Sequence, residues 1–470
     1  MRFSTATLLT VLSSLISVEA TCSYTGGNYY CSETSKVVYK GIGFSGSYQD
    51  VISMDESSGS CSQQEYTFSG NLSPLDEELS VHFRGPLKLL QFGVYYPSSN
   101  SSSSSNAKRD DTAEVEAEVE AEGCTTVKHH KHKRATAIVE VTQTVYVDGQ
   151  GNLVTSQSTT TNTQLETDSA QTDLQAAIAT QIGEGKAYRS ISTKSAPTTT
   201  TASTASTSSS SSSSGSTESS EPSSDVSGAW TRDSYYTPGS TDNCVFLNYY
   251  GGSGSGVWSS AFGNSLSYAN SDASGGSSSA VALEEVTIGS NTEYVIMSGN
   301  ECSGSSCGFY RSGSVAYHGF GGAQKIFAFE FEMPLDSSAS GYNADMPAIW
   351  LLNAKIPRTL QYGDESCSCW KTGCGELDLF EILSSGSDKL ISHLHDGQGA
   401  SSEQVNTGGG GSQDYFARPT SGSMKAVVIF TSDDIHIVQV DDSIDFDTSL
   451  TEDQVNAWIE QLGSVATIGY

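Results

Sequence analysis

The sequence predicts an all-β protein whose C-terminal part is a β-sandwich or β-jelly roll. From about residue 228 onward, short apolar and aromatic runs alternate with turns rich in glycine and serine, and the one expected helix covers residues 452–462. A hydrophobic content of 36% is low for a single packed globule, so part of the chain is expected to stay unfolded. We therefore expect a signal peptide, a small β-rich module and a disordered linker before the jelly roll, which covers residues 228–470.

Residues 1–20 have the pattern of a secretory signal peptide. Arg2 provides the positive start, residues 8–18 form an apolar core, and residues 18–20 are a small-residue cleavage site. The alternative is a buried N-terminal strand. The apolar run is too short to span a membrane, and no later segment is long enough, so we expect secretion and no membrane span.

Residues 21–98 are predicted to form a small Cys/Gly-rich β module. Four short runs have the composition of strands, at residues 37–39, 66–68, 79–83 and 89–96. The aromatic residues of this module either stack on sugar rings or belong to its own core. Two Asn-x-Ser sequons, at Asn71 and Asn100, predict a glycoprotein.

Residues 99–227 have the composition of a disordered linker, first charged and then rich in serine and threonine. An acidic repeat at residues 113–118 precedes a basic run at residues 128–134 that contains three histidines. The histidines could bind a metal, but a solvated charged run is the simpler interpretation. Lys133-Arg134 resembles a dibasic processing site, and we expect cleavage there during secretion.

The ten cysteines indicate a disulfide framework, as expected for a secreted chain. Four lie in the first part and six in the last, so both sets are even: Cys22, Cys31, Cys61, Cys124, Cys244, Cys302, Cys307, Cys367, Cys369 and Cys374. The spacing leaves the pairing open, although Cys302 and Cys307 could close a tight loop. A metal site of Cys367 and Cys369 with His393 and His395 is the alternative, and oxidation of the thiols would remove it.

The formal net charge of −31 and the pI of about 4.4 argue against nucleic acid as a partner, because nucleic-acid binding needs a basic surface. The charge suits a secreted protein that acts on a neutral or cationic polymer, or it serves solubility alone. We expect a monomer without a cofactor or metal.

Three acidic residues within six positions form the most informative motif. Glu376 and Asp378 point to the same face of a strand, because strand residues alternate. Glu381 is at an odd offset from Glu376, and one β-bulge at Leu379 or Phe380 would return it to that face. The bulge would leave a row of three acids with one of these two apolar residues buried behind it.

Such a row favours glycoside hydrolysis. Neighbouring carboxylates raise one another's pKa, so one can hold a proton while another is ionised. A glycosidase needs this division between a carboxylic acid and a carboxylate, which are about 5–5.5 Å apart in retaining enzymes. The alternative is an acidic edge strand that faces water.

The sequence Glu-Leu-Asp-Leu-Phe-Glu at residues 376–381 resembles the bulged signature of glycoside hydrolase family 16, whose members act on β-1,3-glucans and related polysaccharides. The resemblance implies that the C-terminal domain is a concanavalin-like β-jelly roll. The flanking segments are also similar to that family: residues 346–352, 392–395 and 424–441. Many members have Trp where this chain has Phe430. The resemblance covers roughly residues 230–470, and the whole chain resembles the fungal "target of SBF" cell-wall proteins.

The resemblance implies a role for each acid. Glu376 would be the nucleophile, Glu381 the general acid and then base, and Asp378 the residue that tunes the pair.

The resemblance also implies three substrate-binding residues. Trp350 would stack on a sugar ring, Trp370 would form a platform at the rim, and His395 would donate a hydrogen bond. Their respective alternatives are a core tryptophan, a loop anchor and a satisfied core histidine.

The expected function is that of a retaining endo-β-1,3-glucanase or glucanosyltransferase of the cell wall, since either water or a sugar hydroxyl can resolve a glycosyl-enzyme. One alternative is a non-catalytic glucan-binding or structural wall protein. Another is a lectin-like adhesin on the same fold.

Overall fold

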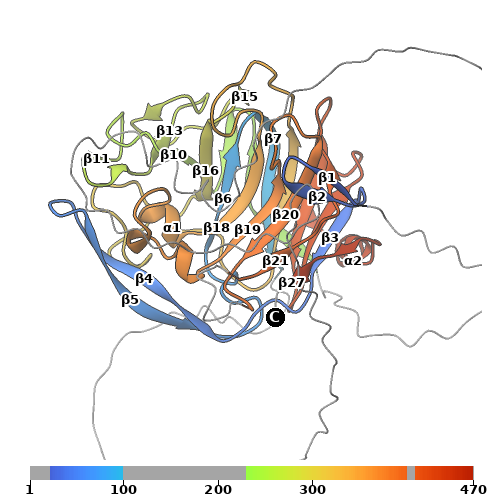
Figure 1. Cartoon of the computed structure of the whole chain (residues 1–470), viewed down its shortest axis with the longest axis horizontal. Helices are drawn as coiled ribbons and strands as arrows, with labels where there is room; N and C mark the ends of the chain where they lie inside the picture. Colours follow the sequence, from blue (N-terminus) through green and yellow to red (C-terminus); the bar gives the residue numbers. More distant parts are fainter. Residues whose placement is uncertain (1–21, 99–228, 400–407, 469–470) are drawn as a thin grey trace, which may run out of the picture. The chain divides into compact units, whose positions relative to one another are not determined.

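The computed structural model describes residues 22–98, 229–399 and 408–468, which form two large β-sheets that face each other (Figure 1). These residues all belong to one compact unit. The predicted all-β jelly roll is confirmed. The signal peptide, the linker with its dibasic pair, Asn100 and Cys124 lie outside the described residues.

The first sheet has 11 strands in the order β14-β13-β10-β16-β6-β18-β19-β20-β21-β27, with β22 paired to β20. Its strands are β6 Leu79–Arg84, β10 Cys244–Asn248, β13 Ser267–Ala269, β14 Gly276–Ser277, β16 Glu293–Ser298, β18 Ala348–Asn353, β19 Glu376–Glu381, β20 Lys389–His395, β21 Gly410–Gly411, β22 Phe416–Ala417 and β27 Thr467–Ile468.

The second sheet has 10 strands in the order β25-β8-β7-β17-β23-β24-β3-β26, with β15 paired to β7 and β9 to β8. Its strands are β3 Lys36–Tyr39, β7 Leu87–Pro97, β8 Trp230–Thr237, β9 Ser240–Asp242, β15 Thr287–Ile288, β17 Lys325–Glu332, β23 Met424–Phe430, β24 Ile435–Val440, β25 Ser449–Leu450 and β26 Ser464–Val465.

Short hairpins and helices surround these sheets. The hairpins are β1 Ser23–Thr25 with β2 Asn28–Tyr30, β4 Gly46–Asp55 with β5 Ser60–Phe68, and β11 Trp258–Ser259 with β12 Gly263–Asn264; the helices are α1 Lys355–Arg358, α2 Glu452–Ile459 and the 3-10 turns η2 Glu365–Cys367 and η3 Trp370–Thr372. The predicted helix at 452–462 thus begins as expected and ends earlier, with the Thr451 side chain capping its start. None of the helices among the described residues is long and apolar enough to cross a membrane.

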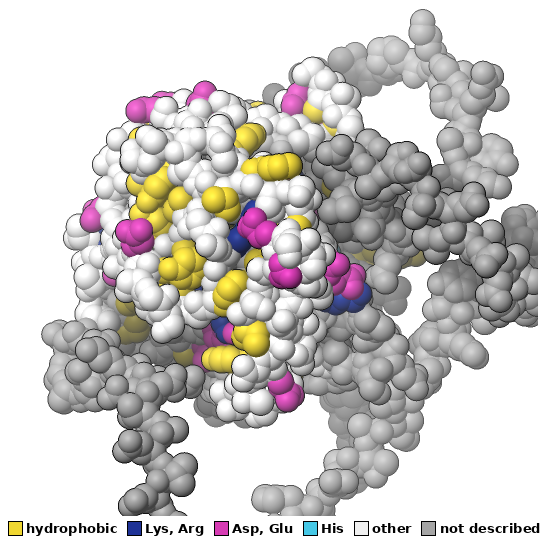
Figure 2. Space-filling view, turned by 90° about the vertical axis from the view of Figure 1, so that its left-hand side faces the viewer, with side chains coloured by type: hydrophobic (Ala, Val, Ile, Leu, Met, Phe, Trp, Pro, Cys, Tyr) yellow, Lys and Arg dark blue, Asp and Glu magenta, His cyan; other side chains and the backbone are white. Residues whose placement is uncertain are grey.

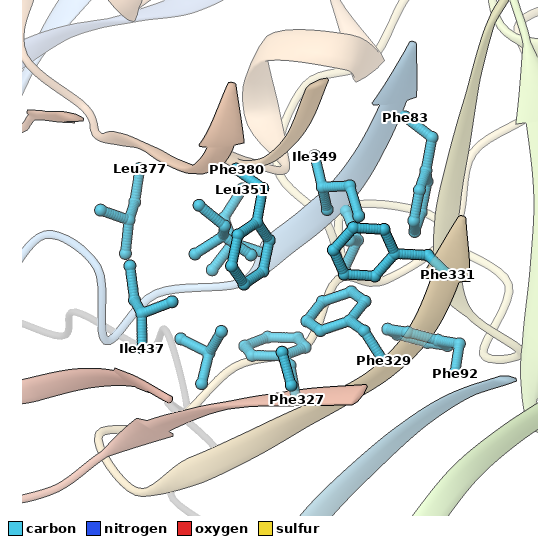
Figure 3. Close-up of a cluster of buried hydrophobic side chains, with 14 of the residues drawn as sticks. Phe83, Phe92, Phe327, Phe329, Phe331, Ile349, Leu351, Leu377, Phe380 and Ile437 are labelled. Carbon is cyan, nitrogen blue, oxygen red and sulfur yellow. The ribbon is translucent and has the colours of Figure 1, made fainter. Parts of the chain in front are cut away.

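Aromatic and aliphatic side chains fill the space between the two sheets (Figure 3). Phe327, Phe329 and Phe331 alternate along β17 and point into this core, where Phe331 meets Phe380 of β19 with ring centroids 5.2 Å apart. Ile326 and Ala328 of β17 face the other way and belong to a second cluster that includes residues of α2. The outer face of the second sheet is therefore partly covered, and the outer face of the first sheet carries the acids.

Residues 22–98 do not form a separate module, contrary to the prediction from the sequence. β6 is hydrogen-bonded to β16 on one side and β18 on the other, and β7 lies between β8 and β17. Residues 79–83 are all buried, so β6 needs packed layers on both faces as well as partners on both edges. The predicted boundary between residues 21–98 and 228–470 therefore separates strands of one domain.

The linker connects two strands that are neighbours in the second sheet. Pro97 of β7 is paired with Trp230 of β8, and the Ser98 N–H donates to the Ala229 carbonyl oxygen at 2.7 Å. A short hairpin turn would be enough to connect β7 to β8, and in the sequence residues 99–228 occupy that position.

The disulfides also cross the predicted boundary. The described residues contain the bridges Cys22–Cys31, Cys61–Cys367, Cys302–Cys307 and Cys369–Cys374. The tight loop closed by Cys302 and Cys307 is confirmed. Cys61–Cys367 joins the first set of cysteines to the second, and the described part of the chain leaves Cys244 as a buried free thiol.

Candidate active site

The three acids lie on β19, and the expected β-bulge is confirmed. The register of β19 against both β18 and β20 shifts between Asp378 and Glu381. Glu376, Asp378 and Glu381 therefore face the same side of the sheet. Leu379 and Phe380 are both buried in the core, where the sequence had predicted only one of them.

A serine on the next strand holds the bulge in place. Ser392 of β20 donates its hydroxyl hydrogen to the Asp378 carbonyl oxygen at 2.5 Å, beside the register shift. Tyr39 of the second sheet is hydrogen-bonded to the same hydroxyl group at 2.8 Å. These side chains satisfy a buried backbone group beside the shift and so fix the position of the acids.

A row of rings crosses the sheet at Asp378. Asp378 is paired with His393 on β20 and Trp350 on β18, and Trp350 is paired with His82 on β6. Trp350 and His82 are stacked, with ring centroids 5.2 Å apart. Burial lowers the pKa of His82 to about 3, so this ring is neutral. Trp350 is only 5% exposed, which makes it the floor of the site, on the same face as the acids.

A second row crosses the sheet at Glu381 and contains a cation that sequence reasoning missed. Glu381 is paired with Ala348, and Ala348 is paired with Arg84 of β6. The Arg84 Nη2 atom lies 3.4 Å from the Glu381 Oε1 atom. Glu293 of β16 is opposite Arg84 and extends the row. No local signal marks Arg84, because only the register of β6 against β18 places it beside the acids.

Burial raises the pKa of both outer acids. The pKa of Glu376 rises to about 8 because of burial and the charge of Asp378, although His395 and Trp370 oppose the rise. The pKa of Glu381 rises to about 7 through burial and Asp378, with Arg84 opposing. Near neutral pH both carboxyl groups are therefore partly protonated.

His395 is held at the acids by Asp378. Its Nε2 atom lies 3.5 Å from the Asp378 Oδ2 atom. Burial disfavours the charged ring, but the hydrogen bond and charge of Asp378, with the charges of the glutamates, raise the pKa of His395 to about 9. The ring is therefore cationic at neutral pH and partly compensates the acids.

Trp370 stands at the rim and contacts an acid directly. Its indole Nε1–H donates to the carboxylate of Glu376, and 39% of the residue is exposed. The ring centroid lies 6.4 Å from that of His395. Trp370 thus has an exposed aromatic face beside the acids, whereas Trp350 has almost none.

The β4–β5 hairpin braces the loop that carries Trp370. The disulfide Cys61–Cys367 ties β5 to this loop, and Cys369–Cys374 closes it. The Gln49 N–H donates to the Thr372 hydroxyl oxygen at 2.9 Å. The rim beside Glu376 is therefore built from segments on both sides of the linker in the sequence.

Among the described residues of the site, one group of side chains could bind a metal ion. Cys367 and Cys369 are both oxidised, so the alternative metal site with His393 and His395 is wrong. Asp378, Glu381 and His393 have ligand atoms within 4.8 Å of one another and could hold a cation.

Comparison with known proteins identifies the family. One family model, described as "Cell wall protein YJL171C/Tos1, C-terminal", matches residues 228–458, and its N-terminal counterpart matches residues 35–97. A relative from Candida albicans is 63% identical over 100% of both chains. The chain belongs to this cell wall protein family.

Other Tos1-family relatives extend over nearly the whole chain. One from Saccharomyces cerevisiae is 54% identical over 99% of each chain, and one from Schizosaccharomyces pombe is 41% identical over 95% of each. The Candida and Saccharomyces proteins are both named "Probable circularly permuted 1,3-beta-glucanase TOS1". No solved structure is significantly similar to the chain.

Proposed function

We propose that this Tos1-family protein is a secreted retaining glycosidase that cleaves or transfers β-1,3-glucan of the cell wall. The observation that carries the proposal is the bulge of β19, which places Glu376 and Glu381 on one face with Asp378 between them. The names of the relatives and the resemblance to glycoside hydrolase family 16 support the same substrate class.

Glu376 is the proposed nucleophile and Glu381 the proposed acid and base. Donation by the Trp370 indole and the charge of His395 both stabilise the carboxylate form of Glu376. The raised pKa of Glu381 keeps a proton available near neutral pH. The order of the two pKa values would put the proton on Glu376, but the productive form is the one with the proton on Glu381 and a carboxylate at Glu376.

The reaction follows from these positions in two steps. Glu381 gives its proton to the glycosidic oxygen while Glu376 attacks the anomeric carbon, which forms a glycosyl-enzyme and releases the shortened glucan. Glu381, now a carboxylate, takes a proton from water or from a sugar hydroxyl. That oxygen attacks the anomeric carbon and frees Glu376, so both routes retain the configuration.

Substrate contacts are assigned from exposure and hydrogen bonding. Trp370 is the aromatic platform, and His395 positions Asp378 and contacts the sugar. Trp350 is almost fully buried beside Asp378 and supports the acids instead of stacking on the sugar.

The test is turnover of defined β-1,3-gluco-oligosaccharides by the full chain, with products followed by mass and the first-formed anomer by NMR. Products with retained configuration are expected, and Glu376→Gln and Glu381→Gln should lower the rate by at least about 10²-fold. The dependence of the rate on the leaving group assigns the two roles. Glu381→Gln should regain activity on substrates with activated leaving groups, whereas Glu376→Gln should not. Binding without turnover by the wild-type protein would instead support a non-catalytic glucan-binding protein of the wall.

A further inference from the structure

A cavity lies at the tip of the β4–β5 hairpin, and β18, β19 and β20 contribute none of its lining residues. Its volume is about 350 Å³, and its lining includes Met54, Glu56, Val257, Trp258, Tyr310 and Arg311. The hairpin tip and β11 lie at the left of Figure 1, and on that side hydrophobic side chains gather around a few acidic and basic ones (Figure 2).

Arg311 gives this cavity a buried polar group with hydrogen-bonding capacity left over. The residue is only 1% exposed. Its Nη2 atom donates to the Ser259 hydroxyl oxygen at 3.0 Å, and its Nε atom lies 3.5 Å from the Glu56 carboxylate. Its Nη1 atom has no hydrogen-bond partner among the described residues. Buried guanidinium N–H groups nearly always have an acceptor, so this unpaired donor marks Arg311 as the unusual polar residue of the cavity wall.

The remaining lining indicates a neutral, hydroxylated ligand. Trp258 is 62% exposed and offers a large aromatic face beside the apolar Met54 and Val257. Glu56 already balances the charge of Arg311 and would repel an anion. An aromatic face with a few polar groups suits a sugar ring, which has apolar faces and a rim of hydroxyl groups.

The β4–β5 hairpin connects this cavity to the candidate active site. Gln49 of β4 contacts the loop that carries Trp370, and Glu56 follows seven residues later at the cavity. Seven residues of strand extend over about 23 Å, at about 3.3 Å each. A glucan that reaches both places must therefore be several sugar units long.

We propose that this pocket binds a glucosyl unit of the same β-1,3-glucan chain, far from the bond that reacts, and so favours long chains over short oligosaccharides. The identity of the ligand rests on the proposed function. The existence of a sugar site rests on Trp258 and Arg311.

The experiment compares the full-length protein with its Trp258→Ala, Trp258→Phe and Tyr24→Ala variants. Tyr24 is a matched control because it is also an aromatic residue of a short hairpin strand and is 64% exposed. Turnover is measured on long soluble β-1,3-glucan and on short oligosaccharides. Binding to insoluble β-1,3-glucan particles is measured by depletion from solution.

Trp258→Ala is expected to raise the KM for long glucan, and to weaken binding to the particles, by about threefold to tenfold. The kcat and the turnover of short oligosaccharides should not change, Trp258→Phe should restore most of the affinity, and Tyr24→Ala should match the wild type. Unchanged KM and unchanged particle binding in Trp258→Ala would overturn the proposal. If the wild-type protein binds without turnover, the proposed function fails, and particle binding alone decides on the pocket.

Discussion

Replacing residues 99–228 by a four-residue turn should leave the domain folded. β7 and β8 are antiparallel neighbours whose ends are joined by the 2.7 Å hydrogen bond from Ser98 to Ala229. A four-residue connection between two such strands is an ordinary hairpin loop. The same reasoning predicts that residues 228–470 alone will not fold, because they lack β6 and β7.

The deletion of residues 99–228 and the truncation to residues 228–470 should change the free energy of unfolding in opposite directions. Closing a connection of about 130 residues costs (3/2)RT ln(130/4), or about 3 kcal/mol, more chain entropy than closing four residues. The deletion should therefore raise the free energy of unfolding by up to about 3 kcal/mol. The 228–470 fragment instead lacks all the buried side chains of residues 22–98. Seven of them on β6 and β7 are each worth about 1.5 kcal/mol or more: Leu79, Val81, Phe83, Leu87, Leu89, Phe92 and Val94. That loss is comparable to the whole stability of a typical domain, about 5–15 kcal/mol.

The assay is urea unfolding of both secreted variants with disulfides formed, followed by tryptophan fluorescence. The deletion variant should unfold cooperatively at a urea concentration no lower than the wild type, and the fragment should show no cooperative transition. Cooperative unfolding of the fragment alone, or loss of folding in the deletion variant, would refute the single-domain arrangement.

Three further predictions concern the site and its rim. Arg84→Gln removes a cation that opposes the raised pKa of Glu381, so the alkaline limb of the pH–rate profile should move to higher pH; an unmoved limb would separate Glu381 from the acid role. Trp370→Phe keeps the ring but removes the donor to Glu376, so the pKa of Glu376 should rise, the acidic limb should move to higher pH and the maximal rate should fall; a shift of the alkaline limb alone would contradict this. Replacing both Cys61 and Cys367 by Ser removes a bridge between residues 306 positions apart and should lower the free energy of unfolding by about 2–4 kcal/mol in chemical denaturation; an unchanged midpoint would show that the hairpin needs no such brace.

Local patterns were enough to predict several of the longer strands and the row of acids. The run at residues 79–83 matches β6, and the odd offset of Glu381 required the bulge that β19 contains. Both signals lie within a few residues of sequence, where alternation and turn chemistry determine the structure.

The long-range arrangement could not be predicted, because it depends on pairings with no local signal. The partners of β6 are β16 and β18, which begin more than 200 residues later in the chain, and a linker of low-complexity sequence intervenes. That pairing alone brings Arg84 beside Glu381 and His82 beside Trp350. A linker between neighbouring strands looks the same in sequence as one between domains, and the even cysteine sets concealed the Cys61–Cys367 bridge for the same reason.

Trapping the covalent intermediate tests the assignment of Glu376 most directly. In Glu381→Gln, an activated β-glucoside should still react with Glu376, because its leaving group needs little protonation, while the missing base slows release. Mass spectrometry of the digested variant should then show one glucosyl unit on the peptide that contains Glu376, and the label should vanish in the double variant that also carries Glu376→Gln. A label on any other residue, or none while the activated substrate is turned over with retention of configuration, would contradict the role of Glu376 as the nucleophile.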